Sequence, residues 1–116
     1  MNIFLDIDGT LLKQFQSDDL QMMLDRKPEI LPGTLAKLDN WHFNGYNVIL
    51  ASARPEGARQ RTVEQLNEVG IYHYSKLILG LHLGDRVLIN DHPVDSNGRA
   101  IAYSLSRNIG IGEVNV

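Results

Sequence analysis

The feature that most constrains the fold is an alternation of short apolar runs with segments of helical spacing. Residues 2–7 (NIFLDI) are apolar at alternate and adjacent positions, and 46–52 (YNVILAS) are nearly all apolar, as is typical of strands covered on both faces. Two shorter runs, 75–80 (SKLILG) and 86–90 (RVLIN), are separated by a loop that contains glycine. Because strands that alternate with helices form largely parallel sheets, the sequence predicts an α/β domain with a mainly parallel central sheet.

The segments between these runs have the apolar spacing and end signals of helices. Residues 33–44 and 56–69 each carry apolar side chains three or four positions apart and are followed by glycine, which predicts two helices. Residues 11–31 predict a short helix or an ordered loop. An Asn-Gly turn is expected at 97–98, and the run at 100–105 favours a strand over a helix.

Length and composition set the class of protein. A chain of 116 residues with 43% hydrophobic content is expected to form one domain over residues 1–116. The absence of cysteine excludes disulfides and thiolate ligands, so a bound metal must use oxygen or imidazole ligands. The net charge of −3 and the short, acidic first apolar run predict a cytoplasmic protein that binds no membrane and meets nucleic acid only as a substrate. The oligomeric state cannot be read from the sequence.

Polar side chains end three of the predicted strands. Asp6 and Asp8 close the first strand, Ser52 closes the second, and Asn90 and Asp91 follow the run at 86–90. Because ligands of open parallel sheets bind at the carboxyl ends of the strands, these residues are expected to meet at one edge. An unpaired buried carboxylate is costly, so the two acids of the first strand need a cation, a functional role, or both.

In this order the residues resemble the haloacid dehalogenase superfamily of phosphatases. Residues 6–11 (DIDGTL) are similar to its first motif, 48–52 (VILAS) to its second and 88–91 (LIND) to its fourth. The resemblance implies a Rossmann-like three-layer sandwich. The spacings from Asp8 to Ser52 and from Ser52 to Lys76 leave no room for the cap domain found in larger members.

The resemblance also implies a role for each residue. Asp6 would attack phosphorus and form an aspartyl-phosphate, and Asp8 would act as general acid and base. Lys76 would be the basic residue of the third motif, although 80–82 read GLH where small relatives often have Gly-Lys-Pro. The cofactor implied is Mg²⁺, held by Asp6, Asp8 and Asp91. The phosphate would be bound by Gly9, Thr10, Ser52, Ala53 and Arg54.

Two other functional classes stay open at this stage. The uncertain lysine and Asn90 are compatible with a catalytically degenerate domain of the same fold that binds a metal or phosphate. A receiver domain also has an acidic pocket, but the Asp-x-Asp-Gly-Thr spacing counts against it. If the chain is an enzyme, its open site suits a large substrate, such as a phosphorylated sugar or glycan precursor or a nucleic-acid end. Alternatively, another subunit could supply a lid for the site.

Overall fold

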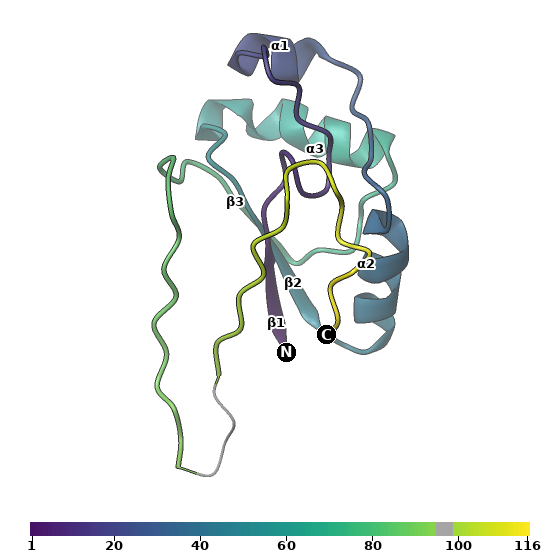
Figure 1. Cartoon of the computed structure of the whole chain (residues 1–116). Coiled ribbons are helices and arrows are strands. Elements are labelled where there is room, and N and C mark those ends of the chain that lie inside the picture. The colour runs from purple at the N-terminus through teal and green to yellow at the C-terminus, as the bar shows by residue number, and fades with distance from the viewer. Residues whose placement is uncertain (95–98) are drawn as a thin grey trace.

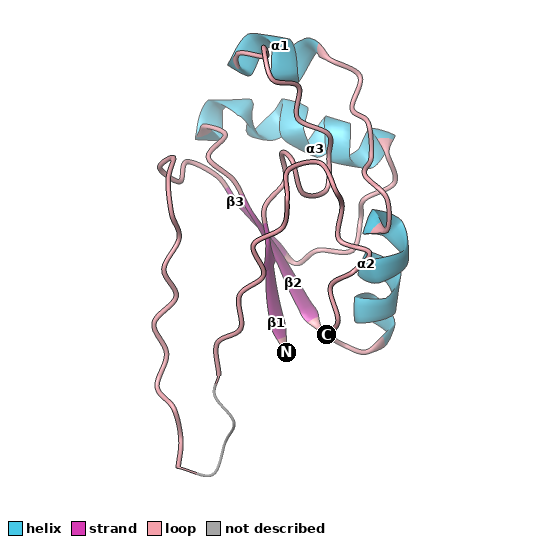
Figure 2. Ribbon diagram, viewed as in Figure 1, coloured by secondary structure: helices cyan, strands magenta, loops and turns pink. Residues whose placement is uncertain are grey.

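The computed structural model of the chain describes residues 1–94 and 99–116, which form a small parallel sheet with helices. Figure 1 shows the order of the elements along the chain, and Figure 2 separates helices from strands. The elements are β1 (Asn2–Leu5), α1 (Leu20–Asp25), α2 (Thr34–Phe43), β2 (Asn47–Ala51), the 3₁₀ turn η1 (Glu56–Ala58), α3 (Arg59–Glu68) and β3 (Lys76–Ile78). The predicted α/β class with a parallel sheet is confirmed.

The sheet has the order β1-β2-β3, and both pairs of neighbours are parallel. Leu5 lies opposite Leu50, and Leu50 lies opposite Leu77. Because the three strands run in the same direction, their carboxyl ends share one edge of the sheet (Figure 1). The side chains that follow β1 and β2 are therefore brought together, as the sequence predicts.

One face of the sheet carries the core. Leu5 and Leu50 point to this face and pack with Trp41 of α2 and Leu66 of α3 in one buried cluster. Trp41 is fully buried, and its indole Nε1 donates to the carbonyl of Val116 at 3.3 Å, so the C-terminal segment closes over the core. The opposite face is less covered: 54% of Phe4 and 38% of Ile78 are exposed.

The predicted helices and the first three strands are found with small shifts in their ends. The helices expected over 33–44 and 56–69 are α2 and the continuous pair η1 and α3. In the segment 11–31, α1 begins after Asp19, whose carboxylate accepts from the amide of Met22 at 2.9 Å. Such a side-chain cap satisfies one of the free amides at a helix start.

The strands predicted at 86–90 and 100–105 are wrong. After β3 the chain leaves the sheet as an extended arm, defined here as residues 81–94 and 99–105, which has no strand or helix (Figures 1 and 2). Residues 79–85 separate β3 from the run at 86–90, whereas a parallel connection takes a dozen or more residues. The run therefore cannot return to the start of the sheet. The turn expected at 97–98 lies outside the described residues.

Within residues 1–94 and 99–116, no helix has the length and apolar character needed to cross a bilayer.

Candidate active site

Asp6 is the first residue after β1, and its side chain is partly open to solvent. The carboxylate is 40% exposed, and Arg86 of the arm reaches one of its oxygens at 3.4 Å. Partial burial raises the pKa of Asp6 above the ordinary aspartate value, and the positive charge of Arg86 acts in the opposite direction. Asp6 is thus an accessible carboxylate whose cationic partner among residues 1–94 and 99–116, Arg86, is distant and exposed.

The loop after Asp6 makes a tight turn around the carbonyl of Ile7. This carbonyl accepts from the amides of Thr10 at 3.2 Å and Leu11 at 2.9 Å, and the amide of Gly9 donates to Leu12 at 2.7 Å. Gly9 has a φ of +86°, which a residue with a Cβ rarely adopts. The amides of Gly9 and Thr10 therefore point to carbonyls of the same loop, and the structure does not direct them to a phosphate.

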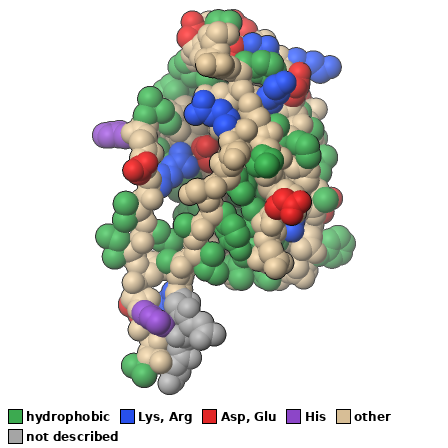
Figure 3. Space-filling view, viewed as in Figure 1, with side chains coloured by type: hydrophobic (Ala, Val, Ile, Leu, Met, Phe, Trp, Pro, Cys, Tyr) green, Lys and Arg blue, Asp and Glu red, His purple; other side chains and the backbone are tan. Residues whose placement is uncertain are grey.

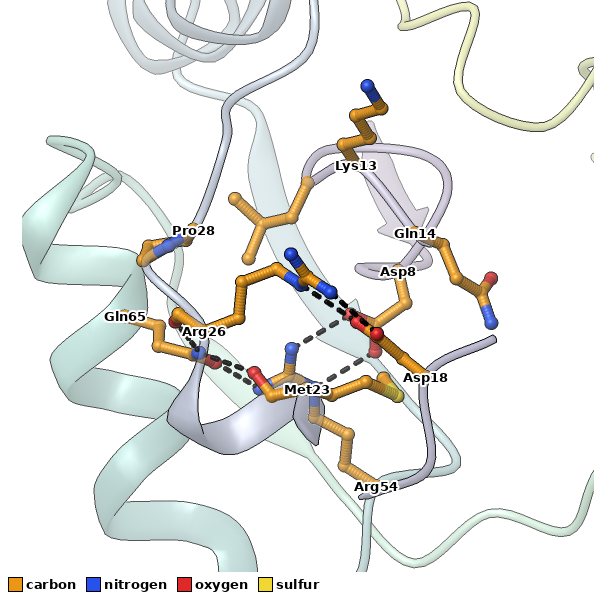
Figure 4. A pocket seen from close by; sticks show the side chains of 10 residues that line it. Asp8, Lys13, Gln14, Asp18, Met23, Arg26, Pro28, Arg54 and Gln65 are labelled. Atoms are coloured by element: carbon orange, nitrogen blue, oxygen red, sulfur yellow. Dashed lines mark hydrogen bonds and ion pairs between the residues drawn. The ribbon is translucent and has the colours of Figure 1, made fainter. Parts of the chain in front are cut away.

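Asp8 is held by a buried arginine. Arg54 is 5% exposed, and its Nε and Nη2 donate to the two carboxylate oxygens of Asp8 at 2.9 and 2.8 Å (Figure 4). Its Nη1 donates to Thr62 Oγ1 at 3.0 Å and to Gln65 Oε1 at 2.6 Å on α3. Such a two-point pair fixes the plane of a carboxylate as well as its position. The arrangement locks Asp8 to β2 and α3.

The phosphate contact predicted for Arg54 stays a prediction, because most of its donors are directed to other side chains and only one is left uncommitted by the described residues. A guanidinium has five N–H donors, and four of them are directed to Asp8, Thr62 and Gln65. In this structure Arg54 is a positioning residue for Asp8.

Ser52 lies at the end of β2, beside the β1 loop, and is almost fully buried. Its Oγ accepts from the amide of Arg54 at 3.0 Å, and its own amide donates to Ile78 at 2.9 Å. These bonds hold the turn from β2 to α3, in which Ala53 is half-buried. A hydroxyl that accepts one hydrogen bond keeps its own proton to donate. The phosphate roles of Ser52 and Ala53 stay predictions.

A second network fastens the α1 segment beside Asp8. Gln65 Nε2 donates to the carbonyls of Met23 at 2.8 Å and Arg26 at 3.0 Å, at the end of α1. Arg26 pairs with both oxygens of Asp18 at 2.9 and 2.6 Å, and this hydrogen-bonded contact lowers the pKa of Asp18. Between the two ion pairs lies a cavity of about 20 Å³, enough for about one water molecule (Figure 4).

Two predicted site residues are not brought to this edge. Lys76 begins β3, and its Cα aligns with Ile49 in the middle of β2 rather than with the strand end. Asp91 lies on the arm, where its carboxylate pairs with Arg99 at 2.5 Å. Within residues 1–94 and 99–116, no three acidic or histidine side chains are grouped closely enough to hold a metal ion.

Three residues of the site were not anticipated from the sequence: Arg86, Thr62 and Gln65. Thr62 and Gln65 are buried and stand three positions apart on α3, on the face that packs on the sheet. Polar side chains at buried helical spacing are a readable signal for an internal hydrogen-bond network. Arg86 gave no such signal, because its contact with Asp6 joins residues 80 positions apart.

Comparison with known families settles the class of the chain. Residues 3–76, more than half of the chain, match the haloacid dehalogenase-like hydrolase family. The chain belongs to this family. Its site residues Asp6, Asp8 and Ser52 all lie within the matched segment.

Individual relatives match the chain over part of their length. It is 32% identical over 77 residues to an uncharacterized protein of Arabidopsis thaliana, At2g39920, a match that covers 66% of this chain and 27% of the relative. It is also similar to chains in two solved structures. In the Pnkp1/Rnl/Hen1 RNA repair complex the identity is 25% and the TM-score 0.57, covering 67% of this chain and 25% of the other. In a second Pnkp1/Rnl/Hen1 complex the identity is 26% and the TM-score 0.58, and the match covers 74% of this chain and 29% of the other.

The chain therefore spans about a quarter of the length of these relatives. The comparisons establish the family and the fold of the chain.

Proposed function

We propose that the chain hydrolyses phosphate monoesters with Asp6 as the nucleophile and Asp8 as the acid and base. The observation that carries this proposal is the contrast between two neighbouring carboxylates at one strand end. Asp6 is 40% exposed and has one distant cation, whereas Asp8 is 15% exposed and is fixed at two points by Arg54. A nucleophile must be reachable, and a proton-transfer group must be oriented. The two positions match these two requirements.

The proposed reaction has two steps. An oxygen of Asp6 attacks phosphorus, and the ester bond breaks as the leaving oxygen takes a proton from Asp8. Water then attacks the aspartyl-phosphate as Asp8 removes its proton, which releases phosphate and restores both carboxyl groups. Each oxygen of Asp8 accepts one bond from Arg54 and keeps a further lone-pair site for the proton.

Asp6 offers the kind of oxygen ligand that Mg²⁺ prefers, but no three acidic or histidine side chains of residues 1–94 and 99–116 are grouped at this edge. Magnesium is commonly held by one or two carboxylates, with waters and substrate phosphate in its other positions. Asp6 and the main-chain carbonyl of Asp8 would be the ligands from β1, and Asp91 remains the predicted third. When bound, the ion would offset the negative charge of the phosphate. The raised pKa of Asp6 comes from partial burial, which the charge of Arg86 does not offset.

The substrate class that we propose first is a phosphorylated nucleic-acid end. Lys13 and Arg107 lie at the β1 loop: Lys13 is 42% exposed, and Arg107 lies against Gly9. Exposed basic side chains around a site favour a substrate with several phosphates. The similarity to a chain of an RNA repair complex points the same way. A phosphorylated sugar or glycan precursor is the second class to test.

The first experiment is a Mg²⁺-dependent assay with p-nitrophenyl phosphate on the wild type and on Asp6→Asn. Turnover by the wild type and none by the variant supports the proposal. Equal rates in the two proteins contradict it. A screen of oligonucleotide ends, nucleotides and phosphorylated sugars then identifies the substrate class.

Beryllium fluoride gives a readout that does not depend on turnover. With Mg²⁺ it should raise the melting temperature of the wild type by binding to the folded protein, and Asp6→Asn should abolish the rise. The same rise in both proteins would count against Asp6 as the nucleophile.

A second candidate function is a non-catalytic domain that binds a metal or phosphate. The position of Asp91 on the arm, paired with Arg99, is the observation that favours it. It predicts a Mg²⁺-dependent rise in melting temperature without turnover on any substrate of the screen. The cytoplasmic location and the single-domain organisation stay predictions.

A further inference from the structure

The described chain has more surface than a compact protein of its size. Its accessible surface is 7782 Å², whereas a folded monomer of 13.0 kDa is expected to have about 6,300 Å². Its radius of gyration is 14.7 Å, against about 13.4 Å for 116 residues in a compact domain. The excess of roughly 1,400 Å² exceeds the ~800 Å² that each partner buries in a standard interface. Figure 1 shows that the arm extends away from the helices and the sheet.

The arm also has the side chains of a buried strand. Val87 and Ile89 are 82% and 87% exposed, Leu88 is 55% exposed, and Ile101 on the other limb is 70% exposed. Figure 3 shows green hydrophobic side chains protruding along the arm. β-branched residues in such a run are enriched in strands, and a contiguous exposed set of this kind marks an interaction surface.

The arm cannot bury this run on its own sheet as a parallel strand. Gly80 and Leu81 are fixed at the carboxyl edge, where their amides donate to Arg54 at 2.7 Å and Ser52 at 3.2 Å. Residue 86 would have to reach the opposite end of β1, across the sheet, within the next five residues. A parallel crossover needs about a dozen. A second copy of the chain has no such limit, because its arm can approach from outside.

The outer edge of β1 is free to receive such a strand. Within residues 1–94 and 99–116, β1 pairs with β2 alone, and β3 likewise has one neighbour. An open edge presents unpaired amides and carbonyls that bind an added strand. The side chains of β1 beside this edge include Ile3, partly buried against the core, and Phe4, 54% exposed.

We propose that two copies of the chain exchange arms, and that residues 86–90 of one copy add to β1 of the other as a parallel fourth strand. The exchange is reciprocal and closes as a two-fold dimer. In the register that places Asp91 beside Asp6, Ile89 lies beside Phe4 and Leu88 beside Ile3. Leu88 then extends the apolar core face of the sheet.

The exchange has a consequence for the site that rests on the proposed function. One copy would supply Asp6 and Asp8, and the other would supply Asp91. The predicted third ligand, which a single chain holds on its arm, would then reach the carboxyl end of β1.

Molecular mass in solution tests the dimer directly. Light scattering during size-exclusion chromatography at about 50 μM chain should give twice 13.0 kDa for the wild type, since dimerisation depends on concentration. Leu88→Asp should give a monomer. Phe43→Asp is the matched control, because Phe43 is 90% exposed on α2, away from the arm, and it should stay dimeric. A monomeric wild type overturns the proposal, as does a mixture of open-ended oligomers.

Cysteine cross-linking tests the register without any assay of activity. The chain has no cysteine, so single variants are clean reagents. A mixture of Phe4→Cys and Ile89→Cys should form a disulfide-linked heterodimer, because adjacent strands bring Cα atoms to bonding distance. The double variant should cross-link between chains. A disulfide within one chain would show that the arm packs on its own sheet and would overturn the exchange.

Complementation tests the shared site. Asp6→Asn and Asp91→Asn should each be inactive, and an equal mixture after exchange should recover about one quarter of wild-type activity, since half of the dimers hold one intact site. If the mixture recovers no activity, Asp6 and Asp91 of each site do not come from different chains, and the shared site is contradicted. If the cysteine variants cross-link between chains but the wild type shows no turnover, the proposed function is contradicted and the arm exchange is still supported.

Discussion

Arg54 is the residue on which the geometry of the site depends most, and its replacement by alanine should be severely destabilising. The guanidinium makes two bonds to Asp8, one to Thr62 and one to Gln65, all between 2.6 and 3.0 Å. Thr62 is 0% exposed and Gln65 is 1% exposed. The variant therefore leaves a carboxylate that is 15% exposed and two buried polar groups without these partners.

The magnitude follows from these contacts. Breaking a buried ion pair by removing one partner costs about 3–5 kcal/mol, and an unsatisfied buried polar group costs about 1–3 kcal/mol. Water entering the space left by the side chain would recover part of this loss. We expect Arg54→Ala to lower the free energy of unfolding by about 4 kcal/mol, a large part of the 5–15 kcal/mol typical of a domain.

Urea unfolding followed by circular dichroism measures this change, and Arg59→Ala is its control. Arg59 also pairs with a carboxylate through two bonds, but both side chains are exposed, 42% for Arg59 and 63% for Glu56. Its loss should cost at most about 1 kcal/mol. If the two variants lose the same small amount, Arg54 does not hold the site together and the reasoning from its buried bonds is refuted.

Three further predictions concern other parts of the chain. Because burial raises the pKa of Asp6, its ionised form is disfavoured in the folded state, so stability is lost as pH rises above the ordinary aspartate pKa. Asp6→Asn should therefore be more stable than the wild type at pH 7 and lose this advantage below about pH 4; urea midpoints at both pH values check it. Lys76→Ala should lower phosphatase turnover far more than it lowers the melting temperature if Lys76 serves the site, whereas wild-type rates would remove it from the mechanism. Gly110→Ala places a Cβ 2.3 Å from the carbonyl oxygen of Pro32 and should cost about 3 kcal/mol, whereas Gly45→Ala, which has a similar positive φ and no atom within 4 Å, should cost about 1 kcal/mol by thermal unfolding.

The sequence predicted the part of the fold that depends on local signals. Apolar runs and helix ends located β1, β2, α2 and α3, and the parallel order then placed Asp6, Asp8 and Ser52 at one edge. These inferences hold because an apolar run of strand length and a helical repeat each bury one surface. Local pattern and tertiary packing agree there.

The errors have a different physical origin. The run at 86–90 has the composition of a strand, but strand formation needs a neighbour with free backbone groups. The connection from β3 is too short for the run at 86–90 to reach such a neighbour in its own sheet as a parallel strand. The contact of Arg54 with Asp8 was not predicted for a related reason: an arginine after a strand can face outward or inward, and the choice depends on Thr62 and Gln65 from another element.

The two ion pairs at the end of β1 differ in strength, and this difference divides the site into a fixed part and an adjustable part. The pair of Asp6 with Arg86 is 3.4 Å long and both side chains are about half exposed, so releasing Asp6 costs no more than about 1 kcal/mol. The buried pair of Asp8 with Arg54 costs several times as much to break. A cation or phosphoryl group that approaches this edge therefore displaces Arg86 and leaves Asp8 in place.

Arg86 belongs to the same run of residues that we expect to join the sheet of a second copy. Arm exchange and the release of Asp6 are then a single event, and Arg86→Ala should weaken neither dimer formation nor the rise in melting temperature with beryllium fluoride. If Arg86→Ala loses the dimer or the rise in melting temperature, Arg86 is needed for the site and does more than pair with Asp6.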